Sequence, residues 1–325
     1  MAICSLVLQR YTFLQAMNHL SDASPRIQPV HDPRLAARRV QLSVLRLDEI
    51  HPMVSGNKWY KLKYNLQQAR QGGYDTLLTV GGAYSNHLYA TAAAGRASGF
   101  KTIGVVRGEA HPTLNPTLQF CQDQGMRLHY VSRADFQQRG QPSFREALQE
   151  QFGRHYFLPE GGSNALAVQG CTEIVGGELP FEYVACCVGT AGTLAGIVTG
   201  TAGKTRVLGF VALKGGEFLS DEVDRLTRAY NGNVYDHYRL VHDYHFGGYA
   251  KVKPELIDFI NTFYRTTGIP LEPLYTGKML YGLYEIAERG YFPAGSRILG
   301  VHSGGLQGIA GFNQRYQSRN LRILA

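Results

Sequence analysis

Lys58 lies in the segment SGNKW at residues 55–59, whose composition predicts a sharp turn that leads into a helix. Glycine and asparagine ahead of the lysine permit a tight backbone at that point. A lysine that is held in place and partly desolvated keeps its amine available as a nucleophile, for example to form a Schiff base with an aldehyde. The alternative is a solvated surface lysine that takes part in no chemistry.

A second candidate is the glycine-rich turn GTAGTLAG at residues 189–196, which directly follows an apolar run. Exposed backbone N–H groups, threonine hydroxyls and a helix dipole suit an anion such as phosphate. The spacing differs from the dinucleotide fingerprint G-x-G-x-x-G, and no Gly-Lys-Ser/Thr follows as it would in a P-loop. A single phosphate monoester is the favoured ligand, unless the turn needs its glycines only for their backbone dihedrals.

Apolar runs, glycine-rich turns and helical segments predict the elements that position these residues. The predicted strands are 75–80, 101–106, 127–132, 183–188, 206–213 and 296–302, and the helical segments include 87–99, 143–151 and 254–268. This alternation is typical of an α/β fold with mostly parallel sheets, whose ligands bind beyond the carboxyl ends of the strands. Residues 1–40 lack clear periodicity and are expected to form an irregular arm.

Size and composition narrow the class of protein. A chain of 325 residues with 44% hydrophobic content suits two domains that share a cleft. It contains no apolar stretch of the roughly 18 residues that a membrane helix needs. The net charge of +8 comes from scattered lysines and arginines, which favours a basic surface for anionic ligands over nucleic-acid binding. No signal peptide is recognisable, although Met17 is an alternative start, so a cytoplasmic location is expected.

The five cysteines do not form a recognisable metal or disulfide pattern. They are Cys4, Cys121, Cys171, Cys186 and Cys187, an odd number without a C-x-x-C pair. Buried free thiols in a reducing compartment are therefore predicted, and no metal site is expected.

Several segments, in this order, resemble motifs of the fold-type II pyridoxal-phosphate enzymes of the tryptophan synthase β superfamily. The closest group is the D-cysteine desulfhydrase and 1-aminocyclopropane-1-carboxylate (ACC) deaminase family. The segments are SGNKWYKLKY at 55–64, GGAYSNH at 81–87, PEGGSNAL at 159–166, the turn at 189–196, FGGY at 246–249, LYTGK at 274–278 and HSGG at 302–305.

The resemblance implies how the chain would hold pyridoxal 5'-phosphate. Lys58 would carry the Schiff base and later act as the base at the substrate Cα. Asn86 would hydrogen-bond the phenolic oxygen of the cofactor, and Ser303 would contact the pyridine nitrogen. The phosphate would be held by Gly189, Thr190, Ala191, Gly192 and Thr193.

The resemblance also implies a substrate side. Ser85 would lie near the substrate carboxylate or act in proton transfer, and Tyr249 and Tyr275 would line the pocket. Structural alternatives stand beside these roles. Ser85 and Asn86 are both preferred helix N-caps, the tyrosines could simply pack, and His87 is expected to be a helix-start or packing residue.

The implied reaction is a β-elimination on a small amino acid that gives a 2-oxo acid and ammonia. A hydroxyl at Ser303 leaves the cofactor a weaker electron sink than an acid would, which suits expulsion of a good leaving group. Thr276, where ACC deaminases carry an acid, and the SNH motif favour D-cysteine desulfhydrase-like activity, with ACC deaminase as the alternative. A phosphometabolite-binding protein that uses only the turn at 189–196 is the non-enzymatic alternative.

Some positions depart from the family pattern and are expected to line the substrate pocket. They are Trp59-Tyr60, Ala83-Tyr84, Leu88-Tyr89 and the segment LDEI at 47–50. For the fold, the resemblance implies two three-layer α/β/α domains with the cofactor in the cleft between them. Residues 1–61 and 159–325 would form the larger domain, and 62–158 the smaller inserted one. A homodimer is expected, without nucleic-acid or membrane partners.

Overall fold

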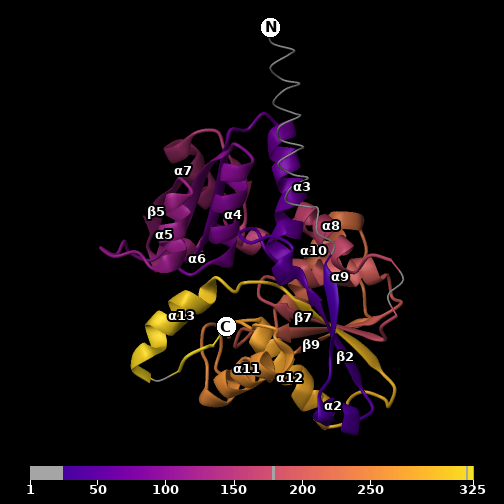
Figure 1. Ribbon diagram of the computed structural model, residues 1–325. Coiled ribbons are helices and arrows are strands. Elements are labelled where there is room, and N and C mark those ends of the chain that lie inside the picture. The colour runs from indigo at the N-terminus through magenta and orange to yellow at the C-terminus, as the bar shows by residue number, and fades with distance from the viewer. Residues whose placement is uncertain (1–24, 178–179, 320, 325) are drawn as a thin grey trace.

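The computed structural model describes residues 25–177, 180–319 and 321–324. Its core is formed by two separate β-sheets, one of six strands and one of four, each covered by helices (Figure 1). The prediction of two α/β units with mostly parallel sheets is confirmed by this topology.

The six-stranded sheet has the strand order β1-β2-β10-β7-β8-β9, and all its neighbours are parallel except β1 and β2. Its strands are β1 (Arg26–Val30), β2 (Gln41–Arg46), β7 (Tyr183–Val188), β8 (Arg206–Val211), β9 (Tyr238–Val241) and β10 (Arg297–His302). Every residue of β7 is buried, and alternate residues belong to two different hydrophobic clusters. A strand covered on both faces must be apolar throughout, which explains the unbroken run YVACCV.

Two groups of helices cover the faces of this sheet (Figure 1). One face packs against α3 (Asn57–Gln71), α8 (Ala165–Thr172), α9 (Gly192–Thr201) and α10 (Leu219–Asn231). The other packs against α2 (Pro33–Ala37), α11 (Pro254–Thr267), α12 (Thr276–Glu288) and α13 (Gly308–Tyr316). Short 3₁₀ turns lie at Leu47–Glu49, Glu160–Gly162, Glu173–Val175 and Gln317–Arg319.

The four-stranded sheet is parallel throughout, in the order β5-β4-β3-β6. Its strands are β3 (Thr76–Gly82), β4 (Lys101–Arg107), β5 (Met126–Val131) and β6 (Tyr156–Leu158). Helices α4 (Asn86–Ala97) and α5 (Pro116–Asp123) pack on one face, and α6 (Arg133–Gln137) and α7 (Pro142–Phe152) on the other. All of these strands lie between residues 76 and 158. The expected domain boundary between residues 61 and 62 falls within α3, and the division of the chain stays a prediction.

One expectation about the N-terminal region is wrong where the structure describes it. Residues 25–40 are not an irregular arm, because they contain β1 and α2. Asp32 caps α2 by accepting a hydrogen bond from the Arg34 backbone N–H, and Pro33 suits the first turn of a helix. Met17 and Cys4 lie outside the described residues.

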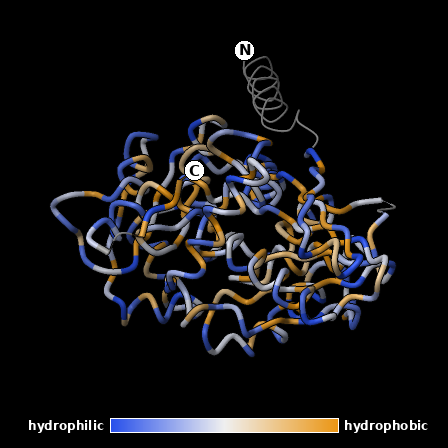
Figure 2. The backbone as a smooth tube through the Cα atoms, turned by 60° about the horizontal axis from the view of Figure 1, so that its bottom comes forward, coloured by the Kyte–Doolittle hydropathy of each residue, from blue (hydrophilic) through white to orange (hydrophobic). Residues whose placement is uncertain are grey.

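Hydrophilic and hydrophobic residues alternate along much of the backbone (Figure 2). Within the described chain, no helix is long and apolar enough to cross a membrane. Cys121, Cys171, Cys186 and Cys187 are buried free thiols, which confirms that part of the cysteine prediction.

Candidate active site

A cavity of about 850 Å³ lies between the two sheets. Its walls come from the start of α3, from the turns after β3, β7 and β10, and from the end of β4. The predicted site residues that line it are Lys58, Ser85, Asn86, Gly189, Thr190, Ala191, Thr193, Tyr249, Tyr275 and Ser303. Gly192 lies just behind the lining, where an added Cβ would come within 2.6 Å of Ser163 Oγ and 3.0 Å of Lys61 Nζ.

The backbone at Lys58 is fixed by the turn after β10. Gly56, the N-cap of α3, has φ 68° and ψ −152°, a conformation open essentially to glycine alone. A Cβ at Gly56 would lie 1.9 Å from the carbonyl oxygen of Ser303, and the Asn57 N–H donates to that same oxygen at 3.1 Å. The Asn57 side chain donates to Thr193 Oγ1 at 2.7 Å. The residue before Lys58 is thus tied to both candidate cofactor-binding turns.

The Lys58 amine faces the cavity without a hydrogen-bond partner among the described residues. Burial lowers the pKa of its ammonium group, while the nearby thiols of Cys187 and Cys171 act weakly in the opposite direction. A lower pKa increases the fraction of neutral amine at a given pH, which is the form that attacks an aldehyde. The environment of Lys58 therefore fits the nucleophile that the sequence predicts.

The turn between β7 and α9 has a backbone shape that suits an anion. Ala191 adopts a left-handed conformation with φ 57°, and the Gly192 N–H donates to the Thr190 carbonyl at 2.7 Å. Gly189 is packed so closely under Tyr275 that an added Cβ would lie 3.0 Å from the ring. This shape aims the first turn of α9 at the cavity, with its unpaired N–H groups available to an anion.

Lys61 is a second lysine at the base of the cavity, and the sequence analysis did not identify it. Its side chain is 2% exposed, and its amine donates to Gly161 O and Ser163 Oγ at 3.0 Å and more weakly to Thr190 Oγ1 at 3.4 Å. Burial, and then the charge of Lys58, lower the pKa of Lys61 to about 7. No carboxylate pairs with it in the described chain, so this buried cation lacks a counter-charge.

A phosphate group fits these observations. It would supply the missing negative charge beside Lys61 and Thr190 and accept hydrogen bonds from the N-terminus of α9. An aldehyde bound beside that phosphate would meet Lys58, which lies three residues before Lys61 and therefore on the same face of α3. The residues present thus fit a phosphorylated aldehyde cofactor.

Comparison with known proteins agrees with this chemistry. The sequence pattern of the family described as "Pyridoxal-phosphate dependent enzyme" matches residues 28–304, which is most of the chain. The chain belongs to that family. Pyridoxal 5'-phosphate is accordingly the cofactor of this enzyme, and the non-enzymatic alternative is set aside.

Individual relatives are similar over most of their length. The enzyme is 29% identical over 276 residues to a putative ACC deaminase of Pyrococcus horikoshii, which covers 82% of this chain and 84% of that protein. It is 29% identical over 293 residues to the mitochondrial bifunctional D-cysteine desulfhydrase/ACC deaminase of Arabidopsis thaliana, with coverage of 83% and 73%. The crystal structure of an ACC deaminase homologue superposes with a TM-score of 0.80 at 26% identity, covering 94% of this chain and 98% of that one.

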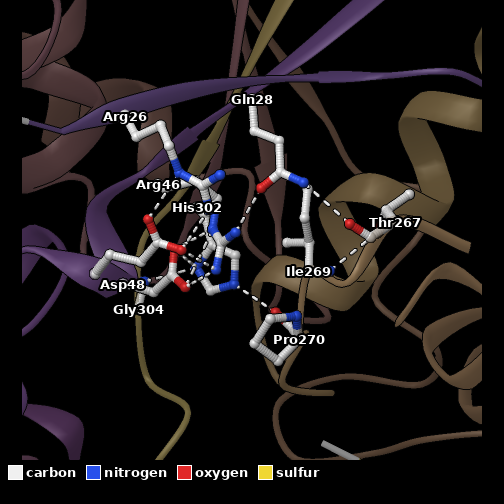
Figure 3. A network of polar contacts seen from close by, with 10 residues as sticks. Arg26, Gln28, Arg46, Asp48, Thr267, Ile269, Pro270, His302 and Gly304 are labelled. Carbon is white, nitrogen blue, oxygen red and sulfur yellow. Dashed lines mark hydrogen bonds and ion pairs between the residues drawn. The ribbon is translucent and has the colours of Figure 1, made fainter. Parts of the chain in front are cut away.

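A buried polar network holds the turn that carries Ser303 (Figure 3). The Nε2–H of His302 donates to Pro270 O at 2.7 Å, and Nδ1 accepts from the Gly304 N–H at 3.2 Å. Asp48 lies 3.4 Å from Nδ1 and is itself paired with Arg46 at 2.6 Å. Burial lowers the pKa of His302, which keeps the ring neutral and able to accept the Gly304 hydrogen bond. The network fixes the turn between β10 and α13.

Ser303 has a second neighbour inside the cavity. Its Oγ lies 3.1 Å from the Sγ of Cys187, the penultimate residue of β7. Burial raises the pKa of Cys187 to about 11, so the thiol stays protonated and neutral. Ser303 thus lines the cavity, and its contact with the pyridine nitrogen stays a prediction.

The two candidate tyrosines lie side by side, with ring centroids 5.9 Å apart. Burial raises the pKa of Tyr249 and raises that of Tyr275 well above its ordinary value, so both phenols are proton donors near neutral pH. Tyr275 is positioned by the buried carboxylate of Glu272, which accepts from the N–H groups of Leu274, Tyr275 and Thr276. Burial raises the pKa of Glu272 despite these three bonds.

The turn after β3 carries Ser85, which caps α4, and Asn86; both residues line the cavity. Ser85 Oγ accepts from the backbone N–H groups of His87 and Leu88, both at 3.2 Å, which confirms the N-cap interpretation. Asn86 begins α4, and its Oδ1 accepts from Gln307, the N-cap residue of α13, at 2.9 Å. His87 is 1% exposed and packs beside Gly162, in keeping with the expected packing role. Ligand contacts of Ser85 and Asn86 remain predictions.

The expectation that the departures from the family pattern line the substrate pocket is wrong. None of them is among the residues that line the cavity. Trp59, Tyr60 and Leu88 are buried in hydrophobic clusters, and Tyr89 stacks on Phe120 with ring centroids 3.7 Å apart. Successive helical residues are rotated by about 100°, which places Trp59, Tyr60, Leu88 and Tyr89 on other sides of α3 and α4 than the side that lines the cavity.

Sequence reasoning also missed functional residues for which signals existed. Lys61 could have been found by its spacing from Lys58, and Ser163 by its place in the motif PEGGSNAL. The hydrogen bond from Gln307 to Asn86 had no such signal, because the two residues are 221 positions apart in the chain.

Proposed function

We propose that this enzyme is a β-eliminating lyase of the D-cysteine desulfhydrase type, which converts a small amino acid into a 2-oxo acid and ammonia. The observation that carries the proposal is the cavity in which the partly desolvated Lys58 amine lies beside a phosphate site built by Lys61 and Thr190. The bound cofactor supplies an electron sink for a substrate carbanion.

Within this scheme, one side chain acts as a base and two others act as proton donors. Lys58 removes the proton from the substrate Cα, a role supported by its lowered pKa. Tyr275 and Tyr249, whose raised pKa values keep them protonated, would donate to a leaving group. Ser85 and Asn86 orient the substrate carboxylate and the cofactor oxygen from the turn after β3.

Two features favour elimination from a β-substituted amino acid. The only side-chain hydrogen-bond partner of the Ser303 hydroxyl in the described structure is a neutral thiol, so the hydroxyl would leave the pyridine nitrogen unprotonated and the electron sink moderate. Thr276 occupies the position at which the resemblance expects an acid in ACC deaminases, and it is buried outside the cavity lining. ACC deamination is the second candidate, because relatives named for that activity match over most of the chain.

The proposal is tested by assaying the holoenzyme for pyruvate release from D-cysteine and for 2-oxobutyrate release from ACC. Pyruvate release supports the proposal when the protein also has a visible absorbance that borohydride abolishes while it fixes the cofactor on Lys58. Oxobutyrate release alone assigns the second candidate. A protein that stays colourless with added cofactor and releases neither product contradicts both.

We also propose that the enzyme is a homodimer and acts in the cytoplasm. The resemblance supports the first, and the four buried free thiols support a reducing compartment. Light scattering of the purified holoenzyme measures its mass directly, and a monomeric mass contradicts the dimer.

A further inference from the structure

The outer part of the cavity is lined by four arginines, which we call the basic rim: Arg107, Arg139, Arg145 and Arg225. Two of them are neutralised. Arg139 pairs with Glu160 at 2.5 Å, and Arg225 binds Glu222 with two contacts of 2.7 Å. Arg107 and Arg145 have no carboxylate partner in the described chain. The rim therefore has an excess of positive charge facing the cavity.

Arg107 is the member of the basic rim that lies beside the turn after β3. It is the last residue of β4 and pairs in register with Gly82, at the start of the turn that carries Ser85 and Asn86. A Cβ added to Gly82 would lie 3.5 Å from Arg107 Nη2, so the guanidinium extends along this turn. Its charge also acts on Tyr249, which contacts Tyr275 deeper in the cavity.

An aromatic ring supports the Arg107 guanidinium. Phe136 lies beneath it, with the guanidinium carbon 5.6 Å from the ring centroid, and Arg139 contacts the same ring at 5.0 Å. Stacking on an aromatic face orients a guanidinium and leaves its N–H groups free for a planar anion. The side chain is thus supported and charged, and its N–H donors have no hydrogen-bond partner among the described residues.

We propose that Arg107 binds a second anionic group at the side-chain end of the substrate, such as a carboxylate. This inference rests on the proposed function and specifies its substrate class: a β-substituted amino acid with an acidic side chain. The volume of about 850 Å³ leaves room for such a chain, since ligand pockets are typically about 300–1,000 Å³. The substrate α-carboxylate would stay at the Ser85 turn.

The test compares two ester substrates, O-acetylserine and O-succinylserine, in both enantiomeric series. They share the leaving-group chemistry, and the second adds a terminal carboxylate. Arg107→Gln should raise the KM of O-succinylserine about 10- to 100-fold, because it removes a charged hydrogen-bond partner. The KM and kcat for O-acetylserine should change by less than about fivefold. Arg107→Lys should retain part of the preference for O-succinylserine over O-acetylserine.

Arg127→Gln is the matched control, since Arg127 also lies against an aromatic ring, that of Phe152 at 5.1 Å, but lies outside the cavity lining. It should change both substrates equally and by less than about fivefold. Equal effects of Arg107→Gln on both esters would show that Arg107 binds the α-carboxylate, and no effect would show a solvated side chain; either result overturns the proposal.

A binding measurement separates this inference from the proposed function. Both esters are titrated into the holoenzyme, and the change in visible absorbance is followed. If wild-type protein binds and turns over O-acetylserine but does not favour O-succinylserine, the acidic-substrate inference fails and the lyase proposal stands. If neither ester changes the spectrum and D-cysteine is not turned over either, both fail.

Discussion

The floor and the rim of the cavity are built in opposite ways. The floor consists of Lys58, Lys61, Ser163, Thr190 and Ser303, which come from four separate segments of the chain. Apart from Lys58, each of these groups has a hydrogen-bonding partner from a distant segment. The basic rim is largely exposed to solvent, and two of its four arginines lack a carboxylate partner.

This difference separates what holds the cofactor from what selects the substrate. Buried polar groups must be satisfied, so a change at the floor disturbs several segments at once. Exposed arginines can be exchanged at little cost in stability. The floor accordingly contains the motifs that resemble the family. The rim contains none of them, and its residues are free to define a different substrate.

The largest effect is expected at Lys58. Lys58→Ala should lower turnover by about 10⁴-fold or more, because it removes both the covalent attachment and the base. Lys63→Ala, on the same helix but outside the cavity lining, is the control and should retain near-normal rates. Steady-state assays of both variants check this. Substantial activity in the Lys58 variant would contradict the role of the floor in chemistry.

Gly56→Ala is expected to reduce the free energy of unfolding by about 3 kcal/mol. The reason is a conformation unsuited to alanine combined with a Cβ 1.9 Å from Ser303 O. Gly73→Ala is the matched control, since Gly73 also has positive φ but open space around it; it should cost only about 1 kcal/mol. Denaturant unfolding of both variants measures the difference, and equal losses would show that the contact with the Ser303 turn is unimportant.

Lys61→Met should weaken binding of pyridoxal 5'-phosphate about 30-fold or more. Removing one partner of a buried charge pair typically costs roughly 2–5 kcal/mol, and 1.4 kcal/mol is about tenfold. Absorbance titration of the apoprotein measures this. An unchanged affinity would place the phosphate away from Lys61.

The lowered pKa of Lys61 also predicts that phosphate binding depends on pH. Its pKa in the apoprotein is lowered to about 7, and bound phosphate would keep it charged, so binding takes up a proton above that pH. The affinity for inorganic phosphate should therefore decrease above about pH 7, by up to about tenfold per pH unit, and Lys61→Met should lack this component. Since the unfolded chain has the ordinary pKa of 10.5, this group also destabilises the apoprotein below pH 7 and ceases to do so as pH rises toward 10.5.

The smallest effect is expected at the rim. Arg145→Gln should change the free energy of unfolding by less than about 0.5 kcal/mol, because the side chain is exposed and its only described contact is with the ring of Phe157. A thermal melt measures it. A loss above about 1 kcal/mol would mean that the rim, like the floor, is structurally constrained.

The sequence predicts much of this fold because buried parallel strands are continuous apolar runs. The six strands expected from such runs all form, whereas β1, β6 and β9 were missed. β1 and β9 are edge strands with exposed residues, and β6 has only three residues, so none produces a strong pattern. β2 was also missed, because Ser43 and Arg46 interrupt its apolar residues.

The site was predictable where residues are close in sequence and not where the fold unites distant ones. The turns that carry Lys58, Ser85 and Ser303 were found from local motifs. The network that joins Asp48 to His302 was not, because it connects residues 254 positions apart in the chain. Residues next to the motifs, such as Trp59 and Tyr60, were wrongly expected to line the pocket for a related reason. Proximity in sequence does not tell which side of a helix faces the ligand.

The double attachment of Asn57 has a mechanical consequence. Its backbone and side chain are tied to the turns after β10 and β7, both of which belong to the six-stranded sheet. A rigid shift of the four-stranded sheet would therefore change the width of the entrance while the reacting nitrogen keeps its distance from the phosphate turn. The enzyme can adjust how substrates enter without moving the atom that performs the chemistry.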